Sequence, residues 1–261
     1  MFKTRLLTAL VGIPLLLLVL NAGGLYWKIL FIGIGLLGYY EITRMMANKE
    51  IKSLFIPGIC FMLLFLFHQS PYFFLGLFFL LMVTVIYIIL ANPRYSITDL
   101  AFTFWGAFYI GFLLSYAIKI GNLEQSFLVI LLALILTWAS DTGAYIAGKL
   151  WGRHKMAPAL SPNKTWEGTG GGLLLSAVAS LAFFLITDMN TVNPAYALIL
   201  GGIASILAQF GDLFISWMKR FFQVKDTGKI LPGHGGILDR FDSFLLVVPL
   251  IYYFAVYVLL I

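Results

Sequence analysis

Residues 211–242 read GDLFISWMKRFFQVKDTGKILPGHGGILDRFD. This stretch holds 4 of the 11 acidic residues of the chain, 5 of its 17 basic residues and one of its 3 histidines. Long apolar segments flank it, and charged groups are costly beside a lipid bilayer. We therefore expect this block to form the core of a site that binds metal and phosphate at a membrane surface.

The rest of the chain is mostly hydrocarbon. Of its 261 residues, 61% are hydrophobic and 11% are charged, whereas a soluble domain carries about 25% charged residues. The apolar runs are long and lack the alternation of barrel strands, which indicates helices. The sequence thus predicts an all-α polytopic membrane protein with about nine transmembrane helices. The predicted segments cover approximately residues 6–21, 25–41, 53–69, 71–91, 97–119, 126–148, 169–187, 194–217 and 243–261.

Two alternatives stay open near the N-terminus. The first two segments are short enough for a re-entrant course, and residues 1–24 resemble a signal peptide. A second apolar run follows at once without a convincing cleavage site, so we interpret residues 1–24 as a retained helix. We divide the chain into N-terminal membrane helices (1–120, about five) and a C-terminal catalytic membrane domain (121–261, about four helices). Two polar connections, 149–168 and 217–242, belong to the second part.

Charge predicts the orientation. With the N-terminus in the cytoplasm and nine alternating spans, 15 of the 17 basic residues lie on the cytoplasmic side, as the positive-inside rule expects. The C-terminus then lies on the opposite side of the cell membrane, and both polar connections face the cytosol. The net charge of +6 on that face suits anionic lipids and metabolites; we expect no nucleic-acid partner. The fifteen are Lys3, Arg5, Arg44, Lys49, Lys52, Arg94, Lys149, Arg153, Lys155, Lys164, Lys219, Arg220, Lys225, Lys229 and Arg240.

The sequence lacks the residue patterns that several kinds of catalysis and binding require. Cys60 is the one cysteine and lies in an apolar run, where we expect a buried small side chain. The sequence contains no CxxC pair, no Ser-His-Asp order and no glycine loop that ends in GK[ST]. Carboxylates beside lysines, arginines and glycine turns instead favour phosphoryl or nucleotidyl transfer, in which the protein mainly positions groups and offsets charge.

The first candidates lie in the sixth segment and the connection after it. Asp141 follows an almost wholly apolar run, so its carboxylate should face a cavity or a partner. Gly143 and Ala147, four residues apart, predict close packing against another helix. In the connection, Lys164 suits phosphate oxygens, and we expect Glu167 to pair with it. The glycines that follow are interpreted as helix-packing positions: Gly168, Gly170, Gly171 and Gly172.

The eighth segment ends in a graded polar face. If it stays helical, Asp212 and Ser216 are i and i+4, and Lys219 and Arg220 follow one turn later. We interpret this face as a path from a metal ligand to a phosphate clamp. An ordinary helix end with snorkelling cations is the alternative, but it does not explain Asp212.

A turn and a second acidic helix start complete the block. The glycines around His234 permit an anion-binding turn of backbone N–H groups. Asp239 and Asp242 would be i and i+3 at the start of the last helix, with Arg240 between them. Magnesium prefers one or two carboxylates, with water and phosphates in its other positions. Simple N-capping by Asp239 is the alternative.

The motif from Ser216 to Asp242 resembles the signature of phosphatidate cytidylyltransferases, also called CDP-diacylglycerol synthases. The stretches SPNKTWEG (161–168) and DTGAY (141–145) also match that family. The resemblance implies a reaction of CTP with phosphatidic acid that gives CDP-diacylglycerol and pyrophosphate in phospholipid biosynthesis. It also implies Mg²⁺, a second metal ion that is divalent or monovalent, a homodimer, and a polar cavity open to the cytosol.

The resemblance assigns roles to individual residues. Asp212 and Asp239 would be the leading metal ligands and catalytic residues, with Asp141 and Asp242 as further metal carboxylates. Asp226, Lys225 and His234 join the catalytic set. The residues assigned to CTP or the phosphatidate headgroup are Asn163, Lys164, Ser216, Lys219, Arg220, Gly235, Gly236 and Arg240.

Two other functions compete with this hypothesis. One is a CTP-dependent enzyme that acts on another lipid, for example a polyprenol kinase, which would transfer the γ-phosphate. The other is an ion- or proton-coupled transporter that uses Asp141 and Asp212 as carriers. A transporter would spread polar groups through both halves, whereas the charge here is concentrated late in the chain and on one predicted face.

Overall fold

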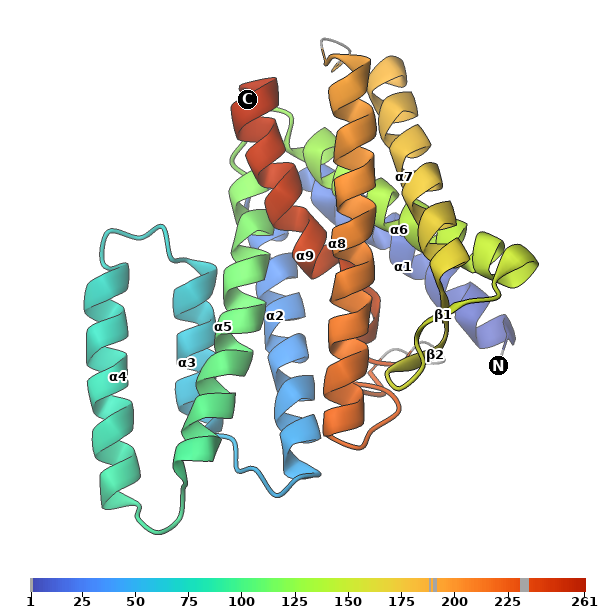
Figure 1. The fold of residues 1–261 in the computed structure, drawn as a ribbon. Helices are drawn as coiled ribbons and strands as arrows, with labels where there is room; N and C mark the ends of the chain where they lie inside the picture. The colour runs from blue at the N-terminus through green and yellow to red at the C-terminus, as the bar shows by residue number, and fades with distance from the viewer. Residues whose placement is uncertain (1, 188, 190–191, 231–234) are drawn as a thin grey trace. The chain divides into compact units, whose positions relative to one another are not determined.

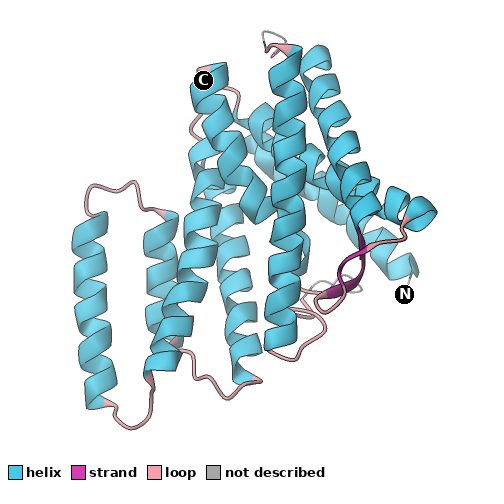
Figure 2. Ribbon diagram, viewed as in Figure 1, coloured by secondary structure: helices cyan, strands magenta, loops and turns pink. Residues whose placement is uncertain are grey.

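The computed structural model describes residues 2–187, 189, 192–230 and 235–261, and it is mostly helical (Figure 2). One helix of the described chain overlaps each of the nine predicted apolar segments, and several of these helices extend beyond the predicted bounds. The helices are α1 (Phe2–Ala22), α2 (Gly24–Ala47), α3 (Phe55–Leu66), α4 (Phe73–Leu90), α5 (Ile97–Ile120), α6 (Ser126–Trp151), α7 (Trp166–Ile186), α8 (Pro194–Phe221) and α9 (Leu238–Phe254). A π-helical turn, Ala255–Leu259, continues α9.

Seven helices of the described chain are long and apolar enough to cross a membrane: α2, α4, α5, α6, α7, α8 and α9 with its π-helical continuation. Shorter apolar stretches occur in α1 (Leu10–Ala22) and α3. The 12 residues of α3 would extend about 18 Å at about 1.5 Å per residue, short of a hydrocarbon core of about 30 Å. A membrane protein is therefore confirmed, while nine spans and the orientation of the ends stay predictions.

The connection between α6 and α7 contains a β-hairpin that the sequence analysis did not predict. Strands β1 (Lys155–Ala157) and β2 (Ser161–Thr165) pair antiparallel, with Lys155 opposite Thr165. Thr165 then caps α7, because its hydroxyl accepts the Gly168 amide at 3.1 Å. The description all-α therefore needs this one correction.

The chain divides into two compact units: residues 1–121 with 221–239, and residues 122–220 with 240–261. In the first unit, α5 packs against α2 and α3, and α4 lies against α3 (Figure 1). The Trp27 indole anchors α2 to α5 through a 2.8 Å hydrogen bond to the Ala117 carbonyl. Asp99 belongs to a capping box with Ser96 at the start of α5 and also accepts the Lys52 amide at 2.7 Å.

The prediction that Cys60 is buried was wrong. Its side chain is exposed, because α3 turns other residues, among them Phe61, Met62 and Phe65, into the interior of the first unit. The apolar run around Cys60 did not indicate which face of the helix would be buried.

In the second unit, helices meet at small residues. Gly143 and Ala147 on α6 lie against Gly171 on α7, which confirms the predicted close packing. Gly201 on α8 likewise lies against the backbone of Ser176 on α7. Where lipid surrounds the helices, packing between them replaces the hydrophobic effect, and small residues let backbones approach. Gly170, by contrast, faces open space, so the packing interpretation holds for its neighbours and not for it.

Candidate active site

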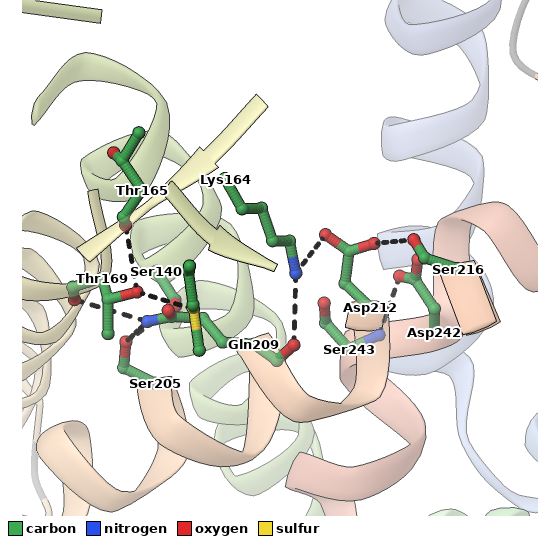
Figure 3. Close-up of polar contacts among 11 residues, drawn as sticks. Ser140, Lys164, Thr165, Thr169, Ser205, Gln209, Asp212, Ser216, Asp242 and Ser243 are labelled. Atoms are coloured by element: carbon green, nitrogen blue, oxygen red, sulfur yellow. Dashed lines mark hydrogen bonds and ion pairs between the residues drawn. The ribbon is translucent and has the colours of Figure 1, made fainter. Parts of the chain in front are cut away.

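Asp212 lies at the centre of a polar cluster in the second unit (Figure 3). The Lys164 ammonium lies 2.8 Å from its Oδ2 atom, and the Ser216 hydroxyl donates to its Oδ1 atom at 3.3 Å. The second contact follows from the predicted i, i+4 spacing on one face of α8. The carboxylate is 36% exposed, so part of it remains open to a ligand.

Lys164 reaches Asp212 from strand β2, and its ammonium also donates to the Gln209 carbonyl on α8 at 3.2 Å. The Gln209 amide in turn donates to the Ser205 hydroxyl at 3.1 Å, and Ser205 and Ser140 share a 2.8 Å hydrogen bond. This buried ladder joins α6 to α8 beside the lysine contact (Figure 3). The hairpin and the ladder together hold the lysine at the acidic end of α8.

Glu167 does not pair with Lys164, and that prediction was wrong. Its carboxylate lies 2.6 Å from the His154 Nδ1 atom and also accepts the backbone amides of Arg153 and His154. Glu167 therefore closes the base of the hairpin. Lys164, three residues earlier on β2, is directed to α8 instead.

Two further carboxylates lie within electrostatic range of Asp212. Asp141 on α6 is one, and Asp242 on α9 is the other. Asp242 is half-buried, and its Oδ1 atom accepts the Ser243 amide at 2.7 Å. Helices α8 and α9 touch here, because Gly211 lies against the backbone of Asp242 and Ser243. The two helices therefore meet at this point, next to Asp212 on α8.

Cations surround this acidic group. Lys164 and Arg240 act electrostatically on Asp141, and Lys219 acts on Asp242. Arg220 is placed differently, since its Nε atom donates to the Leu160 carbonyl in the hairpin turn at 3.3 Å. The second unit therefore gathers three carboxylates and three cations, a composition that suits phosphate and a hard divalent ion.

Asp239 lies three residues before Asp242 on α9 but belongs to the first unit. Its Oδ2 atom accepts the Thr227 amide at 2.9 Å and the Gly236 amide at 3.1 Å, and it lies 3.0 Å from the Thr227 hydroxyl oxygen. Gly235 has a φ of 85° and lies close to Asp239; this left-handed conformation favours glycine. Asp239 therefore fixes the turn that leads into α9, and the predicted metal role stays a prediction.

The remaining predicted residues have simpler surroundings. Asn163 on β2 is exposed, as are Lys225 and Asp226 in the segment after α8. Gly236 is buried against Glu41. His234 lies outside the described residues.

Sequence reasoning missed Glu41. This residue lies on α2 with 1% of its surface exposed, and it accepts hydrogen bonds from three groups in residues 227–238. The sequence contains a signal for it, because Glu41 is the one acidic residue in the apolar segment 25–41. The rule that singled out Asp141, that an acid at membrane depth needs a partner, applies to it equally.

The described residues contain no group of three or more His, Cys, Asp or Glu side chains that could hold a metal ion. Mg²⁺ takes only one or two protein carboxylates in nucleotide sites, with water and phosphates as its other ligands. Asp212, partly exposed and close to Asp242, fits that smaller donor set.

Helices that can cross a membrane and an acidic site with a paired lysine define a polytopic membrane protein equipped to handle phosphate. The chain belongs to the cytidylyltransferase family, whose profile matches residues 3–258. It is 37% identical to a phosphatidate cytidylyltransferase of Bacillus subtilis over 264 residues, which cover 96% of both chains. Proteins of the same name from Staphylococcus saprophyticus and Staphylococcus aureus are 40% and 37% identical, over 95% of this chain and 97% of theirs.

Proposed function

We propose that this chain is a phosphatidate cytidylyltransferase, which transfers CMP from CTP to phosphatidic acid and releases pyrophosphate. The observation that carries the proposal is the Asp212–Lys164 contact, with two more carboxylates in electrostatic range. It lies in a chain whose full-length relatives carry that enzyme name. The substrates are two phosphate anions, one of them embedded in lipid, and the site has the charges that both would need.

The reaction joins a phosphate oxygen of phosphatidic acid to the α-phosphorus of CTP, while the bond from that phosphorus to pyrophosphate breaks. The attacking oxygen is already largely ionised near neutral pH, so the protein needs no strong general base. Its task is to bring two anions together and to offset their charge. We assign this task to the cations Lys164, Lys219 and Arg240, and the Asp212 contact keeps the Lys164 ammonium in place before substrate binds.

We also propose that the enzyme depends on Mg²⁺, with a second metal ion that is divalent or monovalent. When bound, such an ion supplies charge neutralisation between the two substrates and on the departing pyrophosphate. Asp212 and Asp239 remain the leading predicted ligands, with Asp141 and Asp242 as further carboxylates. The donor chemistry supports this assignment, since carboxylate oxygen is the protein ligand that Mg²⁺ prefers.

Orientation and assembly complete the proposal. We place the protein in the bacterial cell membrane with the β-hairpin and the segment after α8 on the cytosolic side, where CTP is found. The support is the concentration of lysine and arginine in these connections. We propose that the working form is a homodimer, as the family resemblance implies.

The test is purified full-length protein with phosphatidic acid, Mg²⁺ and CTP labelled in either the α- or the γ-phosphate. We expect the lipid product to carry the α label and the γ label to leave in pyrophosphate. A lipid labelled from the γ position would indicate a kinase, and ion flux through reconstituted vesicles without nucleotide would indicate a transporter. Asp212→Asn should abolish transfer, and Asp239→Ala should do the same while the protein stays folded in the membrane; substantial activity in either would overturn that residue's assignment.

A further inference from the structure

Glu41 is a buried carboxylate that holds a segment distant in sequence. Its Oε2 atom accepts the Thr227 hydroxyl at 2.8 Å and the Leu238 amide at 2.9 Å, and its Oε1 atom accepts the Ile237 amide at 2.8 Å. All partners belong to the same unit as Glu41 but lie 186 to 197 residues away in sequence. A buried carboxylate is costly unless it is well bonded, and three donors satisfy this one.

Two of these donors are backbone amides at the start of α9. Leu238 is its first residue and Ile237 immediately precedes it. The first amides of a helix have no partner within the helix, and a negative charge at this end is favourable. Glu41 therefore caps α9 from a different helix, α2.

The glycines of the segment leave room for this carboxylate. A Cβ atom at Gly228 or Gly236 would overlap the Glu41 carboxyl group. Neither glycine has a positive φ, so the reason for glycine at both positions is space and not backbone conformation. The Gly228 and Gly236 positions of the 211–242 stretch are thus matched to one side chain on α2.

The contacts of Glu41 lead directly to Asp239. The Thr227 hydroxyl that bonds Glu41 also lies 3.0 Å from the Asp239 Oδ2 atom, and the Thr227 amide lies 2.9 Å from the same atom. On the other side, the Gly236 amide that bonds Asp239 is next to the Ile237 amide that bonds Glu41. Glu41 and Asp239 therefore bond the same two parts of the chain, Thr227 and residues 236–238.

We propose that Glu41 is a positioning residue, which sets the Asp239 carboxylate for nucleotidyl transfer through Thr227 and residues 236–238. The catalytic part of this inference rests on the proposed function. The structural part, that Glu41 holds Thr227 and residues 236–238 in place, stands independently of any reaction.

The test uses full-length Glu41→Gln. The substitution keeps the shape but directs an NH₂ group at backbone N–H donors, so at least one charged contact is lost. Hydrogen bonds to charged groups are among the stronger ones, so their loss should let the segment open more often. We therefore expect trypsin to cleave the variant after Lys225 and Lys229, both exposed, about tenfold or more faster than the wild type. We expect kcat to fall by a similar factor, with little change in the KM for phosphatidic acid and a higher Mg²⁺ concentration for half-maximal rate.

The matched control is Asp99→Asn in the same unit. Asp99 is also buried and accepts two backbone amides, but it holds the connection between α2 and α3. It should leave both readouts near wild type; equal effects of the two substitutions would mean a general loss of stability and would overturn the proposal.

A second pair keeps the test decisive if Glu41→Gln does not fold. Thr227→Val removes the hydroxyl and should act in the same direction, whereas Thr227→Ser should restore both the slow cleavage and the rate. Unchanged cleavage in both Glu41→Gln and Thr227→Val would overturn the proposal, whatever their activity. If the wild-type protein shows no transfer, the proposed function fails, and the cleavage rates still decide whether Glu41 orders the segment.

Discussion

Gly211→Ala tests whether helix packing sets the geometry of the carboxylates. A Cβ atom at residue 211 would lie 3.0 Å from the Ser243 Cα atom and would overlap the Asp242 carbonyl. Carbon atoms in contact prefer about 3.5–4.0 Å, so α8 and α9 must separate by roughly 0.5–1 Å. Such overpacking costs about 1–3 kcal/mol. Because Asp212 follows Gly211 and Asp242 makes the contact, both carboxylates move with the helices.

A displacement of about 1 Å in a reacting site can lower the rate about a hundredfold. We expect the initial rate of lipid labelling from α-labelled CTP to fall about ten- to a hundredfold, together with faster thermal inactivation. Gly202→Ala is the matched control on the same helix, because a Cβ atom there has nothing within 4 Å. If Gly211→Ala and Gly202→Ala behave alike in rate and thermal inactivation, the backbone contact does not control the site.

Three more outcomes follow from the same contacts. Gly228→Ala should speed thermal inactivation in the wild type, because the new methyl group overlaps the Glu41 carboxyl group. In a Glu41→Ala background the same change should be nearly neutral. Equal effects in both backgrounds would contradict the contact. Lys164→Met keeps the apolar stem and removes the ammonium that pairs with Asp212. The KM for CTP should rise about tenfold or more, as expected for loss of a charge-assisted contact. An unchanged KM would show that Lys164 does not bind the nucleotide. Chelation with EDTA should stop transfer and excess Mg²⁺ should restore it, measured by pyrophosphate release, whereas full activity in EDTA would refute the metal proposal.

Local sequence pattern predicted the parts of the fold that depend on local spacing. In the described part of the chain, one helix overlaps each of the nine apolar runs, and the i, i+4 spacing correctly predicted Ser216 against Asp212. The Gly143 and Ala147 spacing indicated the face of α6 that meets α7. The last two features depend on residues within one or two helical turns, where the helix period alone fixes the geometry.

Contacts between distant segments were beyond such patterns. The hairpin strands have 3 and 5 residues, too few for alternation to be visible. The sequence predicts that Glu167 pairs with Lys164, the nearest cation along the chain. In the structure Glu167 contacts His154 across the hairpin, and Lys164 contacts Asp212 on α8. Glu41 shows the limit most clearly, since its partners lie almost 200 residues away and no local period relates them.

In the second unit, one of the glycine contacts between helices lies next to the candidate site. Backbones meet at Gly143 with Gly171, at Gly201 with Ser176, and at Gly211 with Asp242. The last contact is next to Asp212. The positions of the Asp212 and Asp242 carboxylates therefore depend on the distance between α8 and α9. Alanine is the better helix former by about 1 kcal/mol, yet at these positions it must force the backbones apart. Glycine-to-alanine stabilisation should therefore succeed only where the glycine faces open space, as at Gly170 and Gly202, and should cost activity wherever two helix backbones touch.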